Sequence, residues 1–125
     1  MDLNHLPIID WEQAIKLAGN KKIFAEEMLM LLIKDLSNEI TMLKKLNNEK
    51  KYNELLRKVH KLHGALCYCG LPRLKKIISG LENTLKNKIM LDLSSLLDQL
   101  DIEASLLLNH YPNQYTSTAV LDKHI

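Results

Sequence analysis

The apolar residues of this chain recur every three or four positions over most of its length, which is the spacing that one buried face of an α-helix requires. Four long stretches show this spacing, and each predicts an amphipathic helix: residues 21–46, 51–68, 72–85 and 92–109. The connections between them are about three to six residues long, so consecutive helices must mostly lie side by side in opposite directions. The pattern therefore predicts an all-α fold, an antiparallel up-down-up-down four-helix bundle.

A short extra helix is predicted before the bundle. Asp10 stands three residues before Gln13, an arrangement that resembles a capping box and begins a helix there. The pair Gly19-Asn20 ends it after about Leu17. We expect this N-terminal helix to cap one end of the bundle.

Further boundaries are marked by one glycine and two prolines, Gly70, Pro72 and Pro112. Gly70 is predicted to cap the C-terminal end of the 51–68 helix, and Pro72 suits the first turn of the next helix. Residues 111–125 have no helical period and include Pro112, so we expect a flexible C-terminal tail. The bundle domain is accordingly placed at residues 8–110.

The composition narrows the classes of function. The 125 residues suit one domain, and a formal charge of +2 spread along the chain lacks the basic footprint that binds nucleic acid. No apolar run approaches the roughly 20 residues that span a bilayer, so we expect no direct membrane contact. The N-terminal segment also lacks a signal-peptide pattern, so we expect a cytoplasmic location. Because the apolar faces are used inside the bundle, we expect a monomer.

One strip of the 51–68 helix faces away from the predicted core and carries candidate chemistry. His60 lies in the middle of this strip, Gly64 follows one turn later, and Arg57, Lys61 and His63 flank it. A mid-helix glycine costs about 0.5 to 1 kcal/mol relative to alanine, which suggests that Gly64 leaves room for another molecule. An exposed imidazole is largely neutral at neutral pH and can act as a nucleophile. A phosphoryl group on it would have cations nearby.

The same helix also raises the possibility of a metal site. His60, His63 and Cys67 lie along one side of the helix, and imidazole and thiolate suit zinc. Cys69, however, is predicted to point toward the core, and no fourth ligand is evident nearby. We therefore predict no metal site and interpret both cysteines as small apolar residues.

The segment HKLHGALCYCGLPRL, His60 to Leu74, together with Leu81-Glu82, resembles the signature of histidine phosphotransfer (HPt) domains. With the upstream segment IDWEQAIKLAGNKKIFAEEML, the chain is most similar to the C-terminal HPt domain of GacS/BarA-type hybrid sensor kinases. The resemblance covers about residues 8–109. At His63 the family more often has lysine.

The resemblance implies a phosphorelay module. His60 would accept a phosphoryl group from the aspartate of one receiver domain and pass it to the aspartate of a second, a response-regulator receiver. The chain lacks a glycine-rich phosphate loop, so we do not expect it to use ATP or to hold a cofactor of its own. Mg²⁺ would come with the partner receiver.

The resemblance also implies a docking face for the receiver. Its candidate residues are Leu56, Gly64, Cys67 and Leu71. We further expect the chain to be an excised domain whose parent kinase is anchored in the inner membrane. The alternative interpretation is a helical adaptor without catalytic chemistry, in which His60 is replaceable and never carries a phosphoryl group.

Overall fold

The chain folds into helices alone over the residues that the structure, a computed structural model, describes: the backbone of residues 2–124 and the side chains of residues 2–89 and 91–111. The elements are α1 (Trp11–Leu17), α2 (Lys22–Asn48), α3 (Tyr52–Leu66), α4 (Pro72–Lys86), the short 3₁₀ helix η1 (Met90–Asp92) and α5 (Leu93–His124). The predicted all-α class is confirmed. Four of the five predicted helices agree with the observed ones to within about two residues, as expected for boundary assignments.

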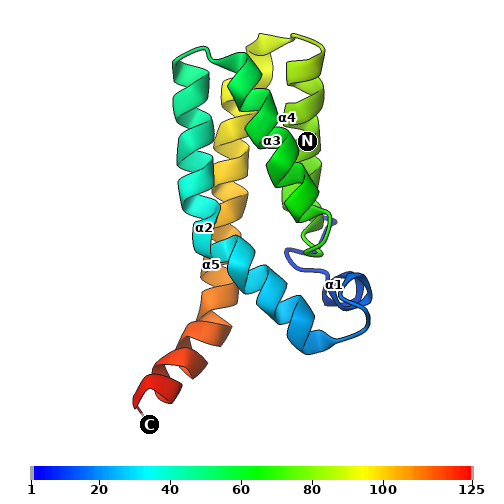
Figure 1. Cartoon of the computed structure of the whole chain (residues 1–125), viewed down its shortest axis with the longest axis vertical. Coiled ribbons are helices and arrows are strands. Elements are labelled where there is room, and N and C mark those ends of the chain that lie inside the picture. Colours follow the sequence, from blue (N-terminus) through cyan, green and yellow to red (C-terminus); the bar gives the residue numbers. More distant parts are fainter. Residues whose placement is uncertain (1, 125) are drawn as a thin grey trace.

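Helices α2 to α5 form the bundle. Each packs beside the next one along the chain, and α5 closes the arrangement against α2. Figure 1 shows that the four helices alternate in direction, with α1 beside the N-terminal part of α2, which turns away from the bundle. The predicted up-down-up-down topology and the extra N-terminal helix are therefore confirmed.

Leucine and isoleucine fill the core between these helices. The largest fully buried side chains are Leu29, Leu36, Leu43, Leu55, Leu66, Leu71, Ile77, Ile78, Leu81, Leu93, Leu97 and Leu100. Burial of one such side chain contributes about 1.5 to 3 kcal/mol, so the core fixes how each helix is rotated about its axis. On α3 this rotation buries Val59 and Leu62. His60 and Gly64, on the opposite side of the helix, are exposed to solvent.

The segment before α1 is attached to the bundle through one arginine. The Nε of Arg73, on α4, donates hydrogen bonds to the backbone oxygens of Leu3 (3.1 Å) and Leu6 (2.9 Å). Its Nη1 lies 3.3 Å from Oε2 of Glu103 on α5. Both charged side chains are almost fully buried, so their mutual contact offsets the cost of removing each from water.

Gly70 joins the start of α1 to the connection between α3 and α4. Asp10 caps α1 as predicted, accepting a hydrogen bond from the backbone N–H of Gln13. The backbone N–H of Asp10 in turn donates to the carbonyl oxygen of Gly70 at 2.8 Å. Gly70 has φ +63, and a Cβ there would lie 2.6 Å from the backbone oxygen of Asp10. This close approach requires glycine.

Two expectations about this connection were wrong. Gly70, predicted to cap α3, is not its C-cap: the helix ends at Leu66 and Cys67 is the cap. The backbone N–H groups of Tyr68 and Cys69 donate hydrogen bonds to carbonyl oxygens three residues earlier, which tightens the chain before Gly70. Leu71, predicted to lie on a docking face, is only 1% exposed and belongs to the core. After the left-handed turn at Gly70 its side chain packs inward, so a docking partner cannot contact it.

Helix α5 continues to His124, beyond the predicted end at Asn109. The side chains of residues 112–125 lie outside the described ones. The flexibility of residues 111–125 and a domain boundary at residue 110 stay predictions.

The substitution Gly70→Ala tests the close approach to α1. We expect it to lower the free energy of unfolding by about 3 kcal/mol or more, because it adds steric overlap to the cost of a left-handed backbone. Gly19→Ala is the matched control, since Gly19 has φ +70 but a Cβ there meets nothing within 4 Å. It should cost about 1 kcal/mol. Equal losses in urea unfolding of the two variants would contradict this account.

Candidate functional site

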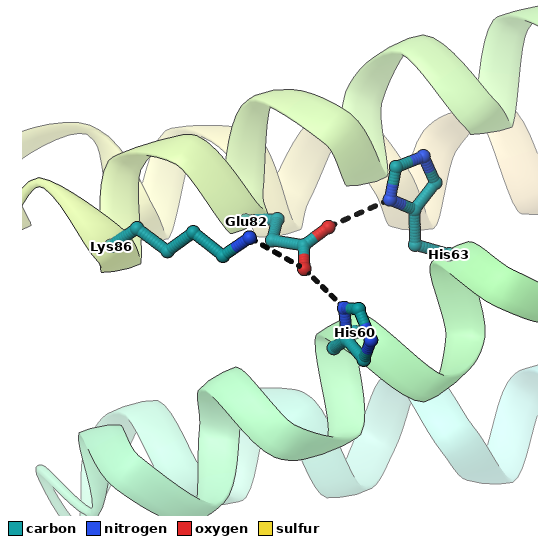
Figure 2. Close-up of polar contacts among 4 residues, drawn as sticks. All are labelled: His60, His63, Glu82 and Lys86. Carbon is teal, nitrogen blue, oxygen red and sulfur yellow. Dashed lines mark hydrogen bonds and ion pairs between the residues drawn. The ribbon is translucent and has the colours of Figure 1, made fainter.

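A buried carboxylate on α4 binds three basic side chains at the seam between α3 and α4. Nδ1 of His60 lies 2.5 Å from Oε2 of Glu82, and Nδ1 of His63 lies 2.7 Å from Oε1 of the same residue. Nζ of Lys86, one turn further along α4, lies 3.4 Å from Oε2. Figure 2 shows the carboxylate between the two imidazoles, with both of its oxygens engaged.

The helical phases of α3 and α4 produce this arrangement. His60 and His63 are three residues apart, so both lie on the same side of α3. Glu82 follows the fully buried Leu81, and only 6% of its own side chain is exposed. The core that joins α3 to α4 therefore also sets the register at which the two histidines meet the carboxylate.

Glu82 is ionised across the neutral range. Burial raises its pKa, but the hydrogen bonds from His60, His63 and Lys86 outweigh burial and hold the pKa at about 2. An ionised carboxylate can only accept hydrogen bonds, so the proton of each neutral imidazole must be on Nδ1. Nε2 of His60 is then left with its lone pair.

His60 presents this lone pair to solvent. Its side chain is 74% exposed, whereas that of His63 is 24% exposed. A carboxylate behind an imidazole fixes the ring's tautomer and increases the electron density at the opposite nitrogen. The arrangement is chemically competent for nucleophilic attack by His60 Nε2 on an electrophile delivered from outside the chain.

The remaining predicted residues of this strip differ in their surroundings. Gly64 is exposed, and a Cβ added to it would meet nothing within 4 Å, so packing within the chain does not require glycine there. Arg57 and Lys61 are exposed and form no ion pair with any described side chain. Lys61 lines a groove between α3 and α2, on the side of α3 away from Glu82.

This groove is mainly apolar and has a volume of about 370 Å³. Its lining residues are Met28, Leu31, Leu32, Asp35, Leu36, Glu39, Lys61, Leu62, Ala65, Tyr68 and Cys69. Leu31 is 70% exposed and Tyr68 57% exposed. Of the predicted docking residues, Leu56 is half-buried against the core and Cys67 is half-buried outside the groove.

Sequence reasoning assigned no role to Glu82 or Lys86. In the sequence, Glu82 stands out only as part of the HPt motif, although it is a charged residue inside the apolar stripe of Ile78, Leu81 and Leu85. A buried glutamate needs partners, and that interruption of the stripe was the available signal. Lys86 carried no signal beyond its position four residues after Glu82.

Metal-ligand clusters and long apolar helices are both absent from the residues that the structure describes. In that part of the chain no group of three or more His, Cys, Asp or Glu side chains is arranged to hold a metal ion. No described helix combines the length and apolarity needed to cross a bilayer.

Cys69 points into the core as predicted. Its thiol donates a hydrogen bond to the backbone oxygen of Ala65, and burial raises the pKa of the thiol to about 11.

Fold and site together define a four-helix bundle that presents one oriented imidazole to solvent. The family model described as "Hpt domain" matches residues 27–110, two thirds of the sequence. This chain belongs to the Hpt domain family. The family assignment made from the motif around His60 is thus confirmed, and it supports a phosphotransfer role in a two-component phosphorelay.

Similar proteins agree with this assignment. The chain is 32% identical over 96 residues to the sensor histidine kinase GacS of Pseudomonas protegens, covering 77% of this chain and 10% of that kinase. It is 29% identical over 98 residues to the signal transduction histidine-protein kinase BarA of Escherichia coli, covering 74% of this chain and 11% of BarA. The chain thus spans about a tenth of the length of the curated relatives it matches.

A solved structure shares the fold. The crystal structure of the HPT domain from a sensor hybrid histidine kinase of Shewanella superposes with a TM-score of 0.71 at 28% sequence identity. The match covers 86% of this chain and 95% of that domain.

Replacing Glu82 by glutamine should change how the free energy of unfolding depends on pH. A carboxyl whose pKa falls from 4.5 to about 2 on folding stabilises the fold above pH 4.5 and loses this effect as the pH falls toward 2. We expect Glu82→Gln to lower the free energy of unfolding by about 3 kcal/mol near pH 7, with the deficit shrinking toward about pH 2.

The measurement is urea unfolding of wild type and variant at a series of pH values. Glu27→Gln, at an exposed position on α2, is the control and should stay close to wild type throughout. A deficit for Glu82→Gln that does not change with pH would contradict the ionised, hydrogen-bonded carboxylate.

Proposed function

We propose that His60 carries the phosphoryl group in this Hpt domain, accepting it on Nε2 from the aspartyl phosphate of one receiver domain and passing it to the aspartate of another. The single observation that supports this most strongly is the geometry of His60. Its Nδ1 is held by the buried Glu82, and the ring is 74% exposed. No other described histidine combines a buried carboxylate partner with this degree of exposure.

The phosphoryl transfer from the receiver to His60 needs no external acid or base. The Nε2 lone pair of neutral His60 forms the N–P bond as the P–O bond of the aspartyl phosphate breaks, and the aspartate leaves as a carboxylate with that electron pair. The proton on Nδ1 stays in place, so the phosphorylated ring is a cation that carries a dianionic phosphoryl group. The reverse sequence delivers the group to the second receiver.

Glu82 assists because its charge is opposite to the charge that develops on the ring. The hydrogen bond between Nδ1 and the carboxylate becomes a bond between two ions as the phosphoryl group arrives, and such bonds are roughly twice as strong as neutral ones. A preformed and largely buried carboxylate provides this stabilisation without reorganising during the reaction.

The receiver must supply the metal ion that phosphoryl transfer from aspartate uses. Mg²⁺ is bound by carboxylates and phosphoryl oxygens. The carboxylate at this site has both oxygens occupied by His60, His63 and Lys86, which leaves it poorly suited to that ion. We therefore place Mg²⁺ on the partner and expect no cofactor on this chain.

The receiver is proposed to approach over Gly64. A partner seated on this glycine would reach His60 on one side and the apolar groove of Leu31, Ala65 and Tyr68 on the other. Arg57 and Lys61 are then free to meet its acidic active site and, with His63, to offset the phosphoryl charge. Leu56 and Cys67 stay candidate contacts at the margin of this face.

The similarity to hybrid kinases supports a proposal for the setting of the domain. We propose that it functions within or beside a membrane-anchored hybrid kinase, on the cytoplasmic side where receivers are found, and as a monomer. The adaptor alternative has one supporting observation, the exposed apolar groove, which needs no histidine chemistry.

The labelling of His60 decides between these functions. Incubation with a phosphorylated receiver and Mg²⁺ should transfer acid-labile, alkali-stable label to the wild-type chain and none to His60→Gln. His5→Gln is the control, because His5 is an exposed histidine outside the site. Label retained by His60→Gln, or absent from wild type with every receiver of the same organism, would favour the adaptor.

Gly64→Ala should separate docking from folding. We expect the variant to be as stable as wild type or more stable by about 0.5 to 1 kcal/mol, because alanine is the better helix former. Transfer from the receiver should fall about ten- to a hundredfold, since the added methyl group displaces the partner from His60. Wild-type transfer rates in a correctly folded variant would contradict an approach over Gly64.

A further inference from the structure

His63 shares a carboxylate with the proposed phosphoacceptor. Its Nδ1 lies 2.7 Å from Oε1 of Glu82, while His60 binds Oε2 of the same group. The side chain of His63 is 24% exposed, so its outer nitrogen, Nε2, can still exchange a proton with water. The net charge at His60, including that of any group bonded to its ring, therefore acts on His63 across the carboxylate that they share (Figure 2).

Two charge states of the site differ by the phosphoryl group. In the unphosphorylated domain with neutral imidazoles, the negative charge of Glu82 is matched by Lys86 at 3.4 Å. Phosphorylation of His60 adds a cationic ring and a dianionic phosphoryl group, which leaves a net charge of −1 uncompensated. Imidazole is the side chain that can gain a positive charge in response between about pH 5 and pH 8.

We propose that His63 takes up a proton on Nε2 when His60 is phosphorylated, so that mildly acidic pH shifts the phosphoryl group from the receiver toward this domain. The inference rests on the proposed function of His60. Linkage makes the effect reciprocal: if phosphorylation favours protonation of His63, protonation favours phosphorylation by the same factor.

Other charged groups near His63 do not provide this response. On α3 its titratable neighbours are His60, one turn before it, and Cys67, one turn after it. On α4 they are Glu82 and Lys86. The carboxylate stays ionised because its pKa is about 2, and lysine ammonium groups titrate far above neutral pH. Thiols ordinarily titrate about two pH units above imidazoles.

The sign of the effect is opposite to that of protonating His60 itself. A proton on Nε2 of His60 blocks phosphorylation, whereas a proton on Nε2 of His63 favours it. The contribution of His63 must therefore be measured against variants that lack its titration. His63→Lys keeps a donor and is always charged, while His63→Gln keeps a donor and is always neutral.

The first measurement follows the ring signals of ¹⁵N-labelled His63 by NMR from about pH 5 to pH 9, before and after phosphorylation with phosphoramidate. The midpoint of its titration should rise by about half a unit to one unit, from the Coulomb interaction with the added negative charge across the site. An unchanged midpoint in a domain phosphorylated at His60 would overturn the inference alone. Failure of any phosphoryl group to reach His60 would overturn both it and the proposed function.

The second measurement is the equilibrium distribution of phosphoryl groups between the domain and its receiver. The ratio of phosphorylated domain to phosphorylated receiver should match that of His63→Lys at about pH 5.5 and that of His63→Gln at about pH 8.5. Between these pH values, the wild-type ratio should change about three- to tenfold relative to the ratio of either variant. A wild type that keeps a constant ratio to both variants across this range would overturn the inference.

Discussion

The carboxylate of Glu82 and its three basic partners connect the fold of this domain to its chemistry. A charged group that is only 6% exposed would be strongly destabilising by itself, since it has lost most of its hydration. Two imidazoles on α3 and one ammonium on α4 replace the lost water. These partners are held in place by the apolar core, so the register of α3 against α4 determines whether His60 is oriented.

This arrangement explains why a plain helical bundle can serve as a phosphotransfer module. The described residues hold one exposed imidazole against a buried carboxylate. The proposal makes this imidazole the nucleophile and assigns the metal and the leaving group to the receiver. In the proposal, Gly64 keeps the approach to that imidazole open, whereas Gly70 joins the start of α1 to the connection between α3 and α4. The two glycines of the motif therefore differ in their surroundings. A Cβ at Gly64 would meet nothing within 4 Å, whereas a Cβ at Gly70 would lie 2.6 Å from the backbone oxygen of Asp10.

Much of the fold could be predicted from the spacing of apolar residues, because a period of three to four positions fixes which side of each helix is buried. The same argument placed His60 outside and Cys69 inside. It could not find the role of Glu82, because the contact between residues 60 and 82 depends on how α3 and α4 pack, and no local pattern encodes that register. Leu71 was misplaced for a related reason: the direction of a side chain after a left-handed turn depends on tertiary packing.

The central claim is that His60 reacts through Nε2 while Nδ1 keeps its proton toward Glu82. The most direct measurement is the NMR spectrum of the ¹⁵N-histidine-labelled domain after phosphorylation by a receiver, in which coupling between phosphorus and nitrogen identifies the bonded atom. The account predicts coupling of the phosphorus to Nε2 of His60, with Nδ1 of the same ring still protonated. A phosphoryl group on Nδ1 of His60, or on His63, would contradict it.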